Sequence, residues 1–241
     1  MFENIQAKIL TIPSRVENAN VLFKQLWSID IETSIFRAIS IEDSTVKPLL
    51  HHYDYIDSTE LPPKLPGSTT YETWHKRPNA YNAWKCHRSM MRDFNRDHHT
   101  DSTKASHLLL VEDDSFIYED EFKKQIYNFF HGFTRAKEPD MVYFGWYSNG
   151  HLDLDDSITY GDTTLYRFKG GAGFHGVLLS YDTVIRLLNM PPVGPFDAIA
   201  GRLQETGHIN AYAVYPASII QLDGHSFVEG HHLSKPKRDK I

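Results

Sequence analysis

The stretch Leu108-Leu109-Leu110-Val111-Glu112-Asp113-Asp114 decides the fold, because four apolar residues lead directly into three carboxylates. A continuous apolar run is typical of a central strand that is covered on both faces of a sheet. Three adjacent carboxylates repel one another unless a cation neutralises them. Ligands of open α/β sheets bind at the carboxyl ends of the strands, so the pattern predicts a metal site at this sheet edge. A solvated turn whose aspartates cap the next helix is the alternative interpretation.

The composition is that of an ordinary globular protein. The chain has 241 residues, of which 41% are hydrophobic and 23% charged, and we expect one domain spanning 1–241. The formal charge of −6 gives no general attraction to nucleic acid or anionic membranes. Cys86 is the single cysteine, which excludes an internal disulfide, and the sequence has no leader-like or membrane-spanning run. We therefore expect a cytoplasmic protein, located in the host cytoplasm if the gene is viral.

Apolar periodicity on either side of that strand predicts alternating strands and helices. Strands are expected at 7–12, 33–39, 108–111, 141–146, 164–168, 177–180, 211–215 and 218–222. Helices are expected at 16–27, 79–96, 119–133, 181–189 and 196–206. This order predicts an α/β fold with a Rossmann-like mixed, mostly parallel central sheet flanked by helices. Residues 53–78 are expected to form an irregular excursion and a candidate lid, and residues 230–241 a flexible basic tail.

Four stretches of the chain form a recognisable order. They are Pro13-Ser14-Arg15 after the first strand, Cys86-His87-Arg88-Ser89 ahead of Leu109-Leu110-Val111-Glu112-Asp113-Asp114, Gly173 through Leu179-Ser180 and the helix to Leu188, and Pro195-Phe196-Asp197 followed by Val214-Tyr215-Pro216-Ala217-Ser218-Ile219-Ile220-Gln221. Together they resemble the family 25 glycosyltransferases, the group that includes lipopolysaccharide-type and procollagen-type galactosyltransferases with a GT-A fold. The resemblance implies a single GT-A domain that moves a sugar from a nucleoside diphosphate sugar, a UDP-sugar above all, to a hydroxyl acceptor. A glycan is the expected acceptor, and a modified DNA base is less favoured.

The acidic run supplies the expected ligands of Mn²⁺ or Mg²⁺. Glu112 and Asp114 are chosen because residues two apart at the end of a strand point the same way. Asp113 is left to face a ribose hydroxyl of the donor or to structure the turn. The resemblance places a further ligand in the late segment 221–226, where His225 is the better candidate. A surface histidine is the alternative interpretation of His225.

The donor is expected to bind beside this metal. The resemblance implies that the loop Thr11-Ile12-Pro13-Ser14-Arg15 contacts the nucleotide, with Arg15 reaching a phosphate. Arg88 and Ser89 lie on the helix that leads to the acidic strand, and we expect them near the diphosphate or the donor sugar. An exposed surface position is the alternative for all three side chains.

The acceptor side is expected to come from the second half of the chain. Asp197 matches the acid that the family carries after a proline, and it is the expected general base of an inverting transfer. A helix N-cap is the alternative role for Asp197. The glycine-rich run 170–173 is expected to form a flexible wall near the acceptor, with His175 as a polar contact.

Three other classes of function remain open at the level of sequence. A nucleotidyltransferase or sugar-nucleotide pyrophosphorylase shares the sheet and the carboxylates, but usually has a glycine-rich, basic phosphate loop near the N-terminus. A metallohydrolase could combine the acidic run with His175 and His225, yet the chain has no HExxH pair. A non-catalytic carbohydrate-binding protein would keep the fold without needing Asp197.

Overall fold

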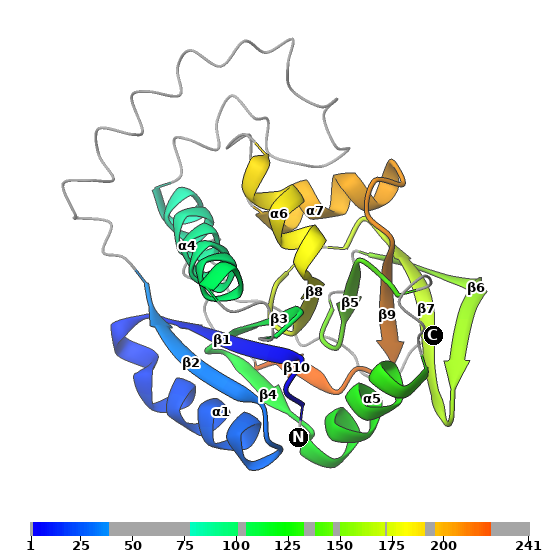
Figure 1. The fold of residues 1–241 in the computed structure, drawn as a ribbon, viewed down its shortest axis with the longest axis horizontal. Helices are drawn as coiled ribbons and strands as arrows, with labels where there is room; N and C mark the ends of the chain where they lie inside the picture. The colour runs from blue at the N-terminus through cyan, green and yellow to red at the C-terminus, as the bar shows by residue number, and fades with distance from the viewer. Residues whose placement is uncertain are drawn as a thin grey trace, which may run out of the picture.

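The computed structural model describes residues 2–38, 78–100, 105–132, 138–146, 150–171, 173–190 and 196–222. These residues form a central sheet with helices on both faces, as Figure 1 shows. The excursion predicted at 53–78 and the tail predicted at 230–241 lie outside the described residues, except for Pro78, which begins a helix. Within the described part of the chain, no helix combines the length and the apolar character needed to cross a membrane.

The main sheet is mixed, as predicted. Its strands are β1 (Ile5–Thr11), β2 (Glu32–Arg37), β3 (His107–Glu112), β5 (Met141–Tyr143), β6 (His151–Tyr160), β7 (Thr163–Lys169), β8 (Val177–Ser180) and β9 (Ala211–Tyr215). Their order across the sheet is β2-β1-β3-β8-β5-β9-β7-β6. The pairs β1–β2, β1–β3 and β5–β9 are parallel, whereas β8 is antiparallel to both β3 and β5. A second, two-stranded sheet pairs β4 (Ser115–Ile117) with β10 (Ile219–Gln221).

Helices cover both faces of the main sheet. They are α1 (Val16–Ser28), preceded by the 3-10 turn η1 (Pro13–Arg15), α4 (Pro78–Thr100), α5 (Glu119–Gly132), α6 (Tyr181–Asn189) and α7 (Phe196–Glu205). In Figure 1, α4, α6 and α7 lie on one side of the sheet, and α1 and α5 lie on the other. Helix α6 begins where the hydroxyl of Ser180 accepts a hydrogen bond from the amide of Thr183 at 3.3 Å, which satisfies one of the free amides of the first turn.

Strand β3 is buried on both faces, which confirms the interpretation of its apolar run. Leu108 and Leu110 pack into the core beneath α4, α6 and α7, while Leu109 and Val111 pack into the core beneath α1 and α5. Burying each of these side chains contributes about 1.5–3 kcal/mol relative to exposure. This two-sided burial fixes the register of β3, and therefore fixes the point at which Glu112 and the following aspartates emerge.

Most predicted elements are present, with shifted ends. Helix α4 continues to Thr100, past the expected end at residue 96, and β5 stops at Tyr143, before the expected end at residue 146. Strands β4 and β6 were not predicted from the sequence. Strand β4 matters for function, because it follows Asp114 directly and brings the late strand β10 beside it.

Candidate functional site

The carboxyl ends of β1 and β3 lie side by side and form the floor of the candidate site. In the parallel register Leu10 is the partner of Glu112, so the loop after β1 meets the turn after β3. The amide of Asp113 donates to the carbonyl of Leu10 at 3.0 Å, which continues the pairing beyond the strands. The predicted donor loop and the acidic run are therefore adjacent.

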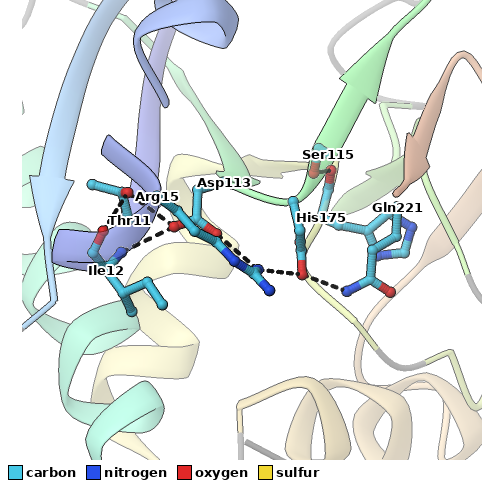
Figure 2. A network of polar contacts seen from close by, with 8 residues as sticks. Thr11, Ile12, Arg15, Asp113, Ser115, His175 and Gln221 are labelled. Atoms are coloured by element: carbon cyan, nitrogen blue, oxygen red, sulfur yellow. Dashed lines mark hydrogen bonds and ion pairs between the residues drawn. The ribbon is translucent and has the colours of Figure 1, made fainter. Parts of the chain in front are cut away.

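Asp113 ties these two segments together (Figure 2). Its Oδ2 accepts hydrogen bonds from the Thr11 hydroxyl and the Ile12 amide, both at 2.9 Å, and its Oδ1 lies 3.3 Å from Nη1 of Arg15. Burial raises the pKa of Asp113, and the bonds from Ile12, Thr11 and Arg15 partly offset that rise. Of the two roles expected for Asp113, the contacts favour structuring the turn over facing a ribose hydroxyl.

Asp114 connects the turn to Arg15 and to the late strand β10. Its Oδ2 accepts from Nη1 of Arg15 at 3.1 Å and from Nε2 of Gln221 at 3.0 Å. Its backbone carbonyl accepts from the amide of Leu222 at 2.6 Å. Its Oδ1 is buried and has no hydrogen-bond partner among the described residues. The late strand β10 thus lies beside Asp114, and the expected ligand His225 lies outside the described residues.

Glu112 faces α4, where it meets a histidine that sequence reasoning did not choose. Nε2 of His87 lies 3.6 Å from Oε1 of Glu112, and the His87 ring stands edge-on to Phe174. Burial raises the pKa of Glu112, the contact with His87 opposes that rise, and the carboxylates of Asp114 and Asp197 add to it. Arg88 and Ser89 were the candidates predicted from the run Cys86-His87-Arg88-Ser89, and the neighbouring His87 was not.

Asp197 lies in the first turn of α7, in the second half of the chain. Its Oδ1 accepts from the amide of Ala198 at 2.8 Å, and its Oδ2 accepts from the amide of Gly173 at 3.2 Å. Asp197 is the second residue of α7, and an N-cap side chain would accept from an amide two or three residues ahead, so these bonds orient the carboxylate without the pattern of an N-cap. Each oxygen of a carboxylate has a second lone pair, so Asp197 retains the capacity to accept a proton from a hydroxyl.

The segment 170–176 before β8, here called the glycine segment, is hydrogen-bonded to α7 through the buried side-chain amide of Gln204. Gln204 donates through Nε2 to the Tyr143 hydroxyl at 2.8 Å and accepts through Oε1 from the amide of Gly171 at 3.1 Å. A Cβ built on Gly201 would lie 3.0 Å from the carbonyl oxygen of Gly171, which shows how closely helix and segment approach. With Asp197 on Gly173, α7 holds this segment at two points.

The remaining predicted donor residues take different positions. Pro13 and Ser14 are exposed on η1, beside Arg15. Arg88 donates to the carbonyl of Met190 at 3.4 Å and lies 5.2 Å from the centre of the Trp84 ring. These contacts brace α4 against the end of α6. Ser89 is half-buried on α4, and no contact of its side chain connects it to the acidic run.

His175 is fully buried, and this burial argues against the predicted contact with an acceptor. Its ring lies against Gly145, where an added Cβ would come within 2.7 Å of it, and its backbone carbonyl accepts from the Ser115 hydroxyl at 2.8 Å. Burial lowers the pKa of His175 to about 4. The position instead suits packing between β4 and the segment after β5.

The donor set of the site suits a hard cation that shares its shell with phosphate. Across the described ranges, no three His, Cys, Asp or Glu side chains are grouped so as to hold a metal by themselves. Mg²⁺ and similar ions, however, are commonly bound by one or two carboxylates together with substrate phosphates. The two carboxylates of Glu112 and Asp114 fit that pattern, because Oδ1 of Asp114 is buried without a hydrogen-bond partner among the described residues.

Comparison with known proteins gives likenesses among solved structures only. No protein-family model matches the sequence, and no curated protein matches it either. Among solved structures, the chain is similar to the crystal structure of a glycosyltransferase involved in the glycosylation of the major capsid of PBCV-1. The two are 9% identical, the match covers 87% of this chain and 81% of that one, and the TM-score is 0.38. At this level the likeness assigns neither an activity nor a substrate to the chain.

Proposed function

We propose that the chain is a metal-dependent glycosyltransferase that moves a sugar from a nucleoside diphosphate sugar, a UDP-sugar, to a hydroxyl acceptor. The observation that carries this proposal is the contact of Arg15 with Asp114 at the carboxyl ends of β1 and β3, where Glu112 ends its strand. A leaving diphosphate needs positive charge, and an attacking hydroxyl needs a base. Arg15 and a carboxylate-bound cation would supply the first, and Asp197 on α7 is the proposed source of the second.

The donor half of the mechanism uses the loop after β1 and the turn after β3. Glu112 and Asp114 would hold Mn²⁺ or Mg²⁺, and the ion when bound would neutralise charge on the departing diphosphate. Arg15 sits beside Asp114 and would bind a phosphate oxygen with its guanidinium. Asp113 keeps the exposed Pro13 and Ser14 in place as a surface for the nucleotide. His225 stays a predicted further ligand.

The acceptor half of the mechanism uses Asp197. Its carboxylate, fixed by the amides of Ala198 and Gly173, would take the proton from the acceptor hydroxyl as that oxygen attacks the anomeric carbon. A base and a leaving group on opposite sides of the sugar give inversion at the anomeric carbon. A glycan is the proposed acceptor, because the net charge of −6 disfavours a nucleic acid.

Titration calorimetry with UDP, in the presence and absence of Mn²⁺, tests the proposal. We expect Mn²⁺ to strengthen UDP binding to the wild type and to have little effect on Asp114→Asn. Asp182→Asn, which removes an exposed aspartate at the start of α6, is the matched control and should bind as the wild type does. A UDP affinity that is unchanged both by Mn²⁺ and by the Asp114→Asn substitution would contradict the assignment.

A panel of nucleotide sugars then defines the reaction. A glycosyltransferase releases the nucleoside diphosphate from its donor, slowly to water and faster to an acceptor. A sugar-nucleotide pyrophosphorylase instead consumes pyrophosphate and releases the nucleoside triphosphate. Chromatography of the nucleotide products separates the two classes without knowledge of the acceptor.

A further inference from the structure

Arg15 already occupies the place of a cation in the candidate site. A single guanidinium nitrogen, Nη1, lies 3.3 Å from Oδ1 of Asp113 and 3.1 Å from Oδ2 of Asp114. The Arg15 side chain is 19% exposed and the Asp114 side chain 18%, so water screens this contact less than it screens a surface ion pair. Arg15 thus shares its single positive charge between two of the three carboxylates that the acidic run brings together.

A second cation on Asp114 would compete with Arg15. Oδ2 of Asp114 already accepts from both Arg15 and Gln221, while its buried Oδ1 has no hydrogen-bond partner in the described part of the chain. A divalent ion on this carboxylate would stand beside a positive guanidinium, and like charges at that separation repel. Tight metal binding therefore requires Arg15 to leave.

The loop can release Arg15 without losing its own shape. The bonds from Thr11 and the Ile12 amide go to Oδ2 of Asp113, whereas Arg15 contacts Oδ1. The amide of Asp113 also pairs with the carbonyl of Leu10. None of these contacts involves the guanidinium, so its release would leave them in place.

We propose that Arg15 is a displaceable counter-ion that transfers from Asp113 and Asp114 to the diphosphate when a nucleotide binds, which makes nucleotide and divalent-cation binding cooperative. This inference rests on the proposed function. The diphosphate gives the guanidinium a new anionic partner, and the vacated Asp114 accepts the metal. By linkage, the nucleotide raises metal affinity by the same factor by which the metal raises nucleotide affinity.

Removal of Arg15 separates this role from simple phosphate binding. In Arg15→Gln, Asp114 loses its resident cation, so Mn²⁺ alone should bind more tightly than to the wild type, by about tenfold. UDP alone should bind more weakly, because a phosphate contact is lost. The factor by which UDP and Mn²⁺ strengthen each other should fall, leaving the part that comes from direct contact between metal and phosphate.

The experiment measures Mn²⁺ binding by the loss of the free-ion electron paramagnetic resonance signal, and UDP binding by calorimetry, each with and without the other ligand. Arg96→Gln is the matched control, because it removes an arginine on the exposed side of α4 that also contacts two aspartates. Its binding constants should equal those of the wild type. If Arg15→Gln does not fold, Arg15→Met replaces it, since it keeps the length of the side chain without its charge, and a smaller coupling factor is again the expected result.

Two failures are distinguishable. If Mn²⁺ affinity without nucleotide is unchanged in the Arg15 variant, and UDP affinity falls equally with and without metal, Arg15 is only a phosphate ligand and the inference is overturned. If the wild type itself binds no UDP with either Mn²⁺ or Mg²⁺, the proposed function fails first.

Discussion

Replacing the buried His175 by glutamine should remove a large part of the pH dependence of stability. The ring is enclosed between the segment after β5 and the small sheet of β4 and β10, where its burial lowers the pKa from 6.5 to about 4. Glutamine is polar and of similar length, but it does not titrate. The variant therefore isolates protonation from packing, which a change to alanine would not do.

The size and sign of the effect follow from linkage. Above pH 6.5 the imidazole is neutral in both the folded and the unfolded chain, so it adds no pH dependence. Between pH 6.5 and about 4 the unfolded chain binds a proton that the folded chain does not, so the free energy of unfolding falls as the pH falls. The full difference amounts to about 3 kcal/mol, and about 2 kcal/mol of it is lost on going from pH 7 to pH 5. That loss is a large fraction of the 5–15 kcal/mol typical of a domain.

Urea unfolding near pH 7 and near pH 5 measures this quantity. The wild type should lose about 2 kcal/mol more than His175→Gln between the two conditions. His151→Gln, which replaces an exposed histidine at the start of β6, is the control and should follow the wild type. Parallel pH profiles for the wild type and His175→Gln would refute the reasoning, because the histidine would then titrate alike in the folded and unfolded chains.

Three further predictions concern the carboxylates and α7. Burial raises the pKa of Glu112 above 4.5, so the folded chain becomes less stable as the pH rises above that value and the unfolded chain releases its proton first. Glu112→Gln should therefore raise the thermal midpoint at pH 7 but not at pH 4, and an equal shift at both pH values would contradict this. Asp197→Asn should leave UDP affinity unchanged and lower the transfer rate about a hundredfold or more in a product-release assay, and loss of folding would instead identify a helix cap. Gln204→Leu should cost about 1–3 kcal/mol in urea unfolding, because the Gly171 amide and Tyr143 hydroxyl lose their buried partner.

The sequence was most informative where burial imposes a simple pattern. The apolar run of β3 predicted a two-sided strand because both of its faces are covered, and the helix predicted at 181–189 has the same bounds as α6. Strand β6 was missed. Leu152 and Leu154 alternate with Asp153 and Asp155, but Asp156 breaks the alternation, and the pairing with β7 stabilises the strand at the sheet edge.

The candidate site could be predicted as a location but not as a set of contacts. Spacing placed Glu112 and Asp114 at a strand end, since that follows from strand geometry alone. It could not decide between the two roles of Asp113, because the deciding partners, Thr11 and Ile12, lie about a hundred positions away along the chain. Long-range contacts also explain why His87 was overlooked: its pairing with Glu112 depends on how α4 crosses the sheet.

The antiparallel direction of β8 means that two separate segments of the chain form the edge of the sheet at the candidate site. Because β8 is antiparallel to β3 and β5, the segment ending at Gly176 reaches the same rim as the ends of its two neighbours. The rim is therefore assembled from two independent stretches, one carrying the acids and one carrying Gly173. The glycine segment has little room for other residues, because an added Cβ at Gly171 would overlap the Phe168 ring and one at Gly176 would lie 2.8 Å from Ile219. Larger side chains there would disturb this half of the rim, whereas β3 keeps its own position through its two-sided burial.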